Sequence, residues 1–167
     1  MRHYHNCIRL LLSFLILITV GEFAQAQCEF QEAMRADGTL NRNYDYETVY
    51  RSDTMSIRMS LAYQGAFRTL RVEYTYSDTL RNRFYKDIDI KLTDSTVVRL
   101  YFISASKESS TGRISCLYEI RQKELGYLTQ YDMVFFEYKR RNGSKTSLLL
   151  TESTDVIKLQ LNCTRKK

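Results

Sequence analysis

The sequence Met55-Ser-Ile-Arg-Met-Ser-Leu-Ala-Tyr63 is followed, six residues further on, by Leu70-Arg-Val-Glu-Tyr-Thr-Tyr76. Apolar residues occupy every second position of both stretches, as they do in a strand that buries one face. Between the stretches, Gly65-Ala66 fits a two-residue type II′ turn, in which glycine takes the position of positive φ. The sequence therefore predicts a β-hairpin here.

Closing this hairpin on Gly65-Ala66 determines which residues face one another. Leu61 then lies opposite Leu70, and the other apolar residues of both strands fall on that same face. A slip of one residue would scatter them over both faces, so this register is strongly specified. On the other face Arg58 lies opposite Glu73, an ion pair expected to contribute ~0.2–1 kcal/mol. The rest of the chain must cover the apolar face.

Residues 1–26 have the features of a signal peptide. Arg2 and Arg9 precede the apolar run 10–20, and Ala24-Gln25-Ala26 is a small-x-small cleavage site. The run is short for a membrane span, and no second such run follows, so no transmembrane segment is expected in the mature chain. We expect an exported protein, periplasmic or extracellular, whose residues 27–167 form one β-rich domain.

Three cysteines remain after removal of the signal peptide, and an exported protein is able to form disulfides. Cys116 falls on the apolar face of the alternating stretch 113–121, which favours a buried thiol. Cys28 and Cys163 lie near the two mature ends, and the pairing Cys28–Cys163 is favoured among the three possible bridges. Isolated thiols without CxxC spacing do not indicate a zinc site, and we expect no cofactor or metal.

Two further hairpins are predicted. Apolar residues alternate in 88–92 and 98–102, and a shared apolar face requires Leu92 opposite Val98, which also sets Lys91 against Arg99. The connection between the two strands would then contain three or five residues around Asp94-Ser95-Thr96, or a bulge would lie near it. The stretches 133–138 and 146–150 flank Asn142-Gly143, a strong two-residue turn signal. That turn pairs Phe136 with Leu149 and gives apolar pairs on both faces, which favours an interior position in the sheet.

The remaining segments are less regular. Residues 29–34 have the length of an edge strand, and 122–129 suggest a short amphipathic helix. In 153–163 the apolar residues alternate as in a strand, although Ser153 or Thr154 followed by Asp155 is also a helix start signal. Periodicity alone slightly favours the strand.

A combination of general features resembles uncharacterised small exported bacterial domains. These features are the signal peptide, Cys28, a hairpin with a Leu-Thr-Asp-Ser turn, a Lys-Glu-Leu-x-x-Leu helix, the Asn142-Gly143 hairpin and Cys163. In such domains the last segment is a helix packed on the sheet, so the resemblance implies a helix at 153–163. It implies no activity and no functional residues.

The composition excludes several chemistries. Both histidines, His3 and His5, lie in the expected signal peptide, which excludes Ser-His and Cys-His nucleophilic catalysis in the mature chain. No GxSxG, GxxxxGK or GxGxxG motif occurs. A glycoside hydrolase that uses only carboxylates remains an alternative, with Asp87, Asp89, Glu119 and Glu137 as candidates, although outward strand positions also explain these residues.

Two groups of residues are candidates for partner binding. Tyr44, Tyr46 and Tyr50 lie in a segment without a clear pattern, where they either contact a partner or pack over the sheet. Lys139, Arg140 and Arg141 form a basic cluster in a chain of formal net charge +6. A weak polyanion-binding role is therefore a second alternative, whereas export and the interspersed acidic residues argue against nucleic acid.

The sequence thus predicts a mainly β fold, with antiparallel hairpins in a sandwich or curled sheet and one or two short helices. The expected function is an exported non-catalytic binding or envelope-associated module, with an unidentified protein or envelope ligand as its partner.

Overall fold

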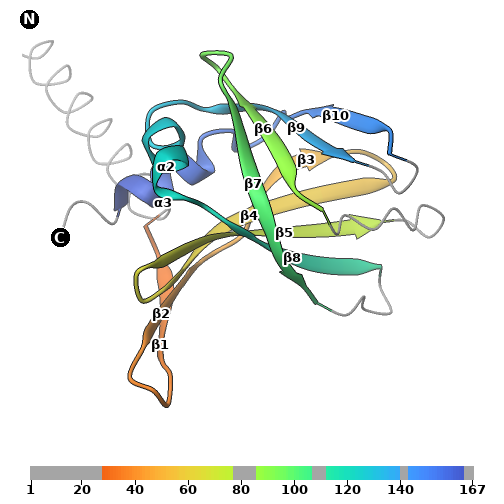
Figure 1. Ribbon diagram of the computed structural model, residues 1–167. Helices are drawn as coiled ribbons and strands as arrows, with labels where there is room; N and C mark the ends of the chain where they lie inside the picture. Colours follow the sequence, from red (N-terminus) through yellow and green to blue (C-terminus); the bar gives the residue numbers. More distant parts are fainter. Residues whose placement is uncertain (1–27, 77–85, 107–111, 140–142, 164–167) are drawn as a thin grey trace, which may run out of the picture.

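The hairpin at Gly65 is the centre of the fold. A computed structural model describes residues 28–76, 86–106, 112–139 and 143–163 (Figure 1). Within it β4 (Met55–Gln64) pairs antiparallel with β5 (Phe67–Tyr76) in the predicted register, with Leu61 opposite Leu70. Gly65 has a φ of 57°, and Ala66 is not among the residues with positive φ, as a type II′ turn requires. Arg58 Nη1 lies 3.2 Å from Glu73 Oε1, which confirms the cross-strand ion pair.

The strands form one antiparallel sheet of ten strands, in the order β1-β2-β4-β5-β8-β7-β6-β9-β10, with β3 paired to the first half of β4. The strands beyond the central hairpin are β1 (Phe30–Met34), β2 (Leu40–Tyr44), β3 (Glu47–Arg51), β6 (Ile88–Leu92), β7 (Val97–Ala105), β8 (Arg113–Glu119), β9 (Met133–Lys139) and β10 (Lys145–Leu149). The predicted fold class is confirmed. Residues 1–26, the expected signal peptide, lie outside the described residues.

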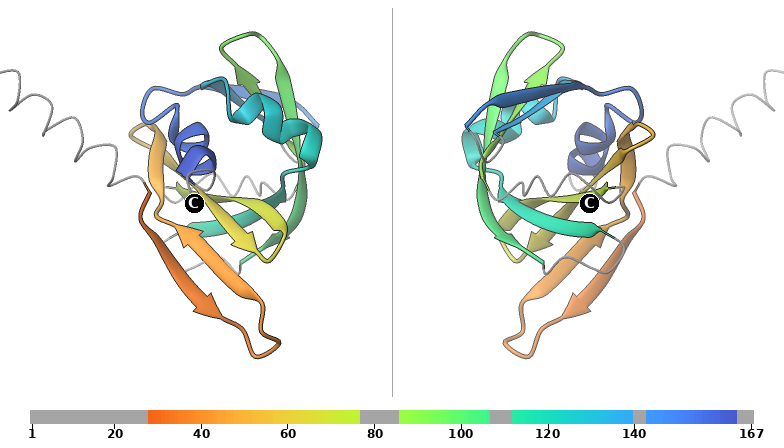
Figure 2. Two further views of the ribbon diagram at one scale, coloured as in Figure 1. Left: turned by 90° about the vertical axis from the view of Figure 1, so that its left-hand side faces the viewer. Right: turned by 90° about the vertical axis from the view of Figure 1, so that its right-hand side faces the viewer.

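The sheet curls around its core without closing (Figures 1 and 2). The chain after β10 comes back to β3, where the amides of Thr151 and Glu152 donate to the Val49 carbonyl at 3.2 and 3.4 Å. Helices α2 (Gln122–Leu128) and α3 (Val156–Cys163) lie at the mouth of the curl that faces the viewer on the left of Figure 2. In the part of the chain that the structure describes, neither helix is long and apolar enough to cross a membrane.

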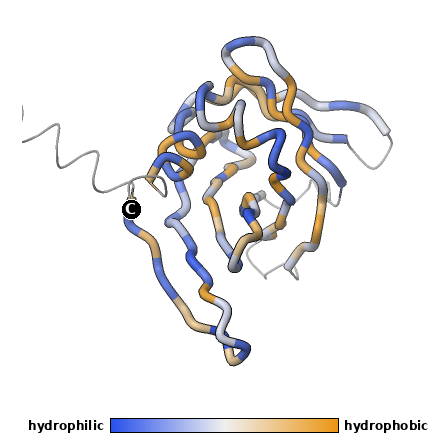
Figure 3. Tube along the Cα trace, turned by 60° about the vertical axis from the view of Figure 1, so that its left-hand side comes forward, coloured by the Kyte–Doolittle hydropathy of each residue, from blue (hydrophilic) through white to orange (hydrophobic). Residues whose placement is uncertain are grey.

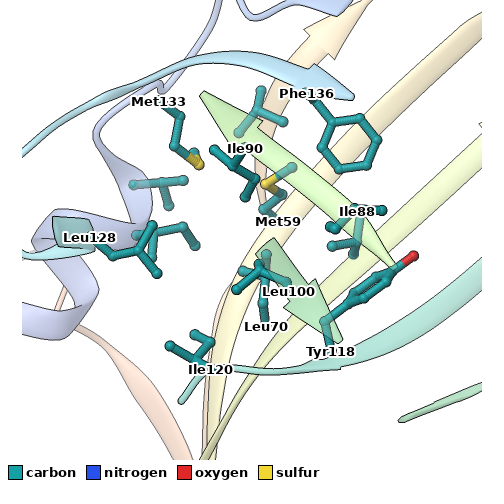
Figure 4. Close-up of a cluster of buried hydrophobic side chains, with 14 of the residues drawn as sticks. Met59, Leu70, Ile88, Ile90, Leu100, Tyr118, Ile120, Leu128, Met133 and Phe136 are labelled. Atoms are coloured by element: carbon teal, nitrogen blue, oxygen red, sulfur yellow. The ribbon is translucent and has the colours of Figure 1, made fainter. Parts of the chain in front are cut away.

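The core lies inside the curl. Hydrophobic and hydrophilic residues alternate along many strands (Figure 3), which places one face of each strand inward. Met59, Leu70, Ile90 and Leu100 come from four different strands and meet Leu128 of α2, and each is at most 1% exposed (Figure 4). Burial of each such side chain contributes roughly 1.5–3 kcal/mol, so the core as a whole is a large source of stability.

The β1–β2 hairpin projects from the body as an arm, with β1 at the edge of the sheet as predicted (Figure 1). A disulfide between Cys28 and Cys163 joins the base of the arm to the end of α3, which confirms the favoured pairing. Cys116 lies outside this disulfide and is fully buried, as its position on the apolar face of β8 predicts.

A buried glutamine holds the arm side of the sheet together. β3 pairs with β4 as far as Met59, and β2 pairs with β4 from Ala62 onward, so the Leu61 amide has no strand partner on that side. Gln160 of α3 fills the gap, because its Oε1 accepts from the Leu61 amide at 2.7 Å and its Nε2 donates to the Asp45 carbonyl at 3.1 Å. No pattern in the sequence predicts this contact.

The predicted register of the second hairpin is wrong. Ile90, not Leu92, lies opposite Val98, and Asp89 lies directly opposite Arg99. The loop has three residues, Thr93 to Ser95, because the Leu92 amide bonds to the Thr96 carbonyl and Ser95 takes a φ of 70°. The observed register avoids the repulsion between Lys91 and Arg99, since Arg99 instead pairs with Asp89.

The register of the third hairpin is also shifted by one residue. Phe136 lies opposite Leu148 rather than Leu149, which excludes a two-residue turn at Asn142-Gly143. Part of that connection, 140–142, lies outside the described residues. β10 ends the strand order, so the interior position predicted for both strands holds only for β9, and Leu149 is 52% exposed.

The last segment is a helix. The resemblance implied a helix at 153–163, and α3 confirms it, whereas the alternating pattern favoured a strand. Val156, Ile157 and Leu161 all face the core, because positions i, i+1 and i+5 lie on one side of a helix.

Candidate functional site

A charged hollow of about 360 Å³ lies where the start of β6 meets the end of β9 and the start of β10. These ends come together because β6 and β10 both pair antiparallel with β9. Three carboxylates, four cationic groups and two aromatic rings line it: Asp87, Asp89, Glu137, Lys86, Arg99, Lys139, Lys145, Phe102 and Tyr138. We call this the charged hollow.

Asp89 is the most deeply placed acid of the charged hollow, with a side chain 12% exposed. Arg99 donates two hydrogen bonds to its carboxylate, from Nε to Oδ1 at 2.8 Å and from Nη2 to Oδ2 at 3.2 Å. The hydrogen bonds from Arg99 hold the pKa of the Asp89 carboxyl below its usual value, against the opposing effect of burial. Asp89 is therefore a fixed anion at neutral pH.

Lys145 bridges two of the acids. Its Nζ lies 3.7 Å from Asp89 Oδ2 and 4.0 Å from Glu137 Oε2. Asp89 and Glu137 are directly opposite each other on β6 and β9, so without a cation between them their charges would repel. The positive charge of Lys145 is consequently shared by two neighbouring carboxylates.

The positive charges of the other two lysines, Lys86 and Lys139, are not balanced by carboxylates among the described residues. Among the described residues, neither Lys86 nor Lys139 forms an ion pair, and both are exposed. Lys139 lies directly opposite Lys145 in the β9–β10 ladder, where like charges are unfavourable. The rim of the charged hollow thus keeps positive charge that no carboxylate among the described residues neutralises.

The aromatic side of the charged hollow continues into the core. Phe102 packs edge-on against buried Tyr118, with ring centroids 6.0 Å apart, and Tyr138 packs against buried Phe136 at the same distance. Asp87 Oδ1 accepts a hydrogen bond from the Phe102 amide at 3.0 Å. The wall of the hollow is therefore anchored by buried rings and does not depend on surface side chains alone.

The structure brings together three of the four candidate carboxylates. Asp87, Asp89 and Glu137 line the charged hollow, whereas Glu119 lies elsewhere and pairs with Arg121 at 3.2 Å. Sequence reasoning did not find the contribution of Lys86, Arg99 and Lys145. These residues share no local motif, and only the pairing of β6 with both β7 and β9 joins them.

The residues that the sequence indicated as candidates for partner binding do not lie together in one site. Lys139 lines the charged hollow, but Arg140 and Arg141 lie outside the described residues. Tyr44 is 1% exposed and packs in the core, where burial raises its pKa to about 12, so its ring is not accessible to a partner. Packing over the sheet, the alternative explanation of its position, is therefore the correct one.

The two other tyrosines, Tyr46 and Tyr50, are partly exposed. Tyr50 packs against the core cluster. Tyr46 covers the outer face of the sheet, where its ring lies beneath the guanidinium groups of Arg58 and Arg71.

Within the described residues no group of three or more His, Cys, Asp or Glu side chains has a geometry that could hold a metal ion. Two of the acids of the charged hollow, Asp89 and Glu137, pair instead with neighbouring cations, and Asp87 accepts the Phe102 amide. Comparison of the chain with protein-family models, with curated proteins and with solved structures finds no match in any of the three. The geometry of the charged hollow is thus the basis for assigning a function.

Proposed function

We propose that this protein is an exported, non-catalytic binding module that holds an anionic group of its partner in the charged hollow. Lys86, Lys139 and Lys145 would contact the anion, and Phe102 and Tyr138 would contact its apolar part. Asp89 and Arg99 would keep the floor of the hollow rigid.

One observation carries this proposal: Lys139 and Lys145 face each other directly across β9 and β10 at the rim of a hollow that also contains Lys86. Opposed like charges cost free energy in the unbound protein. An anion between them removes that cost, so the site is more complementary to a bound anion than to solvent.

Export is supported by the Cys28–Cys163 disulfide, because such bonds persist mainly in oxidising compartments. A ligand of the cell envelope or of the extracellular space therefore fits the proposal better than a cytosolic metabolite.

The proposal is tested with tripolyphosphate as a compact anionic probe, using titration calorimetry at several salt concentrations. We expect saturable binding that weakens steeply with salt. The double variant Lys86→Glu/Lys139→Glu should lose it, while Lys123→Glu, on α2 and outside the hollow, should retain it. Binding that is insensitive to salt and equal in both variants would contradict a charge-driven site.

A second candidate is a carboxylate-dependent glycoside hydrolase, favoured by the convergence of Asp87, Asp89 and Glu137 in one hollow. Such an enzyme needs one carboxyl that stays protonated near neutral pH, whereas the pKa of Asp89 is shifted downward. This difference makes binding the better supported function.

Catalysis is tested by measuring the release of reducing ends from a panel of polysaccharides. A hydrolase would show release that Glu137→Gln abolishes and that Glu119→Gln, outside the charged hollow, leaves unchanged. The binding proposal expects no release from the unmodified protein.

A further inference from the structure

A second, larger hollow of about 600 Å³ lies on the outer face of the sheet, over β2, β4, β5, β7 and β8. It shares no lining residue with the charged hollow. Asn43, Ala62 and Thr69 form a row across three neighbouring strands in its floor, because Asn43 pairs with Ala62 and Ala62 with Thr69. The small side chain of Ala62 keeps the centre of this row low. We call this the polar hollow.

Arg71 is held in place at the edge of the polar hollow by Tyr46. Its Nε donates to the Tyr46 hydroxyl at 3.1 Å, and its guanidinium carbon lies 4.3 Å from the ring centroid. Tyr46 is itself fixed, since its hydroxyl bonds to Ser115 Oγ at 3.0 Å and its carbonyl accepts from Arg58 Nη2 at 3.2 Å. The guanidinium of Arg71 is therefore preorganised before any ligand arrives.

No protein carboxylate neutralises Arg71 within the described residues. The nearest acid along β5, Glu73, is occupied by Arg58 at 3.2 Å and by Arg113 at 3.9 Å. Tyr46 accepts a hydrogen bond from Nε of Arg71, and among the described residues the terminal nitrogens of the guanidinium have no acceptor, so they can donate to a ligand. Such a planar fork matches the two oxygens of a carboxylate.

Three amide side chains stand on the opposite side of the polar hollow. Asn41 and Asn43 of β2 and Gln64 of β4 all line it, and Asn41 pairs directly with Gln64. Within the part of the chain that the structure describes, none of these side chains has a hydrogen-bond partner, and Asn41 Oδ1 is inaccessible to solvent. Amides both donate and accept, which suits the hydroxyl groups of a sugar.

We propose that the polar hollow binds a carboxylate-bearing sugar, such as a hexuronate unit of an acidic polysaccharide. The carboxylate would pair with Arg71, and the ring hydroxyls would bond to Asn43, to Gln64 and to the amide nitrogen of Asn41, whose oxygen is inaccessible. Because arginines cover the ring of Tyr46, that ring positions Arg71 and does not stack on the sugar. Recognition therefore depends on hydrogen bonds and on one ion pair.

The test is calorimetric titration of the exported chain with trigalacturonate and, as a matched neutral probe, its methyl ester. We expect saturable binding of the acid and at least about tenfold weaker binding of the ester, because the charge-assisted bonds to Arg71 are lost. Arg71→Gln should weaken binding of the acid by a similar factor. Ala62→Phe should block the hollow. Arg113→Gln is the control for Arg71→Gln, because it replaces an arginine on the same face of the sheet but outside the hollow, and it should bind as the parent does.

Several outcomes would overturn the proposal. These are no saturable binding of the acid, equal binding of acid and ester, or full binding by both Arg71→Gln and Ala62→Phe. Loss of binding in the Lys86→Glu/Lys139→Glu variant alone would place the ligand in the charged hollow instead. Equal binding of the acidic peptide Glu-Glu-Glu would show that the site reads carboxylates and not sugars. The comparison of acid with ester needs no variant, so it decides the matter even if Arg71→Gln fails to fold.

Discussion

Replacing Gln160 by Met should destabilise the protein far more than the same change at an exposed position. Gln160 is 3% exposed and joins three parts of the chain, α3, β4 and the β2–β3 connection. Methionine has a similar volume and shape, so the substitution removes the amide without opening a large cavity. The effect should therefore report the loss of two hydrogen bonds.

The two bonds differ in what their loss costs. The Leu61 amide belongs to a fully buried residue that no strand covers on that side, so losing Gln160 Oε1 leaves a buried donor unsatisfied, at about 1–3 kcal/mol. Asp45 is exposed, so water can satisfy its carbonyl, and that loss costs only about 0.5–1 kcal/mol. Together they predict a decrease of ~1.5–4 kcal/mol in the free energy of unfolding.

Urea unfolding of Gln160→Met and of the control Gln122→Met, which makes the same change at an exposed position of α2, measures this difference. Hydrogen exchange at the Leu61 amide adds a local measurement, and it should accelerate in Gln160→Met only. If the two variants have the same stability within about 0.5 kcal/mol, Gln160 does not hold the junction between β2 and β3.

Four further predictions concern stability and the state of the cysteines. Gly65→Val should lower stability by about 1–3 kcal/mol, because a β-branched residue is strained at a φ of 57°, and an unchanged melting temperature would count against the turn assignment. Non-reducing peptide mapping should find Cys28 joined to Cys163. Cys116 should react slowly with alkylating reagents in the folded protein, since burial raises its pKa to about 11, and rapid labelling would show that β8 faces the other way. For the same reason Cys116 should contribute to a loss of stability as the pH rises from 9.0 toward about 11, because the thiol then ionises more readily in the unfolded chain. Because the pKa of Asp89 is lowered in the folded state, its carboxylate stabilises the fold above pH 3.8, and this stabilisation is lost as the pH falls through the folded pKa. The difference in stability between the parent and Asp89→Asn should therefore shrink in acid. A difference that stays constant with pH would contradict this.

The sequence predicted the central hairpin fully because two independent constraints agree there. The apolar alternation requires one face to be buried, and Gly65 supplies the single positive φ that the turn needs. In the second hairpin the positive φ falls on Ser95, which is not a glycine. Asp94 makes that loop possible, since its carboxylate accepts from the amide and hydroxyl of Thr96 at 2.9 and 2.7 Å. These hydrogen bonds lie within the loop and do not alter the alternation of apolar residues in the strands. The alternation alone therefore does not reveal the register of this hairpin.

The two hollows could not be derived from the sequence for a different reason. Lys86, Arg99, Lys139 and Lys145 meet only because β6 lies between β7 and β9, a long-range pairing that no local pattern encodes. The polar hollow likewise depends on β2 and β8 lying on opposite sides of the β4–β5 hairpin. Lys139, Tyr46 and three of the carboxylates that the sequence indicated do line one or other of the two hollows, but the sequence could not place them in a common site.

The filled interior of the sheet separates the two proposed binding sites from the core that stabilises the protein. Tyr74, Tyr118 and Phe136 are fully buried inside the curl, where they contribute to the core, whereas the lysines and amides proposed to contact ligands are exposed or half-exposed. Charges at such positions contribute little to folding, typically about 0–1 kcal/mol each. Substitution of Lys86, Lys139 or Asn43 should therefore change ligand binding while leaving unfolding nearly unaffected, whereas Gln160→Met should do the reverse. Because these two kinds of variant act on different parts of the molecule, a binding defect at either hollow is attributable to the site and not to the fold.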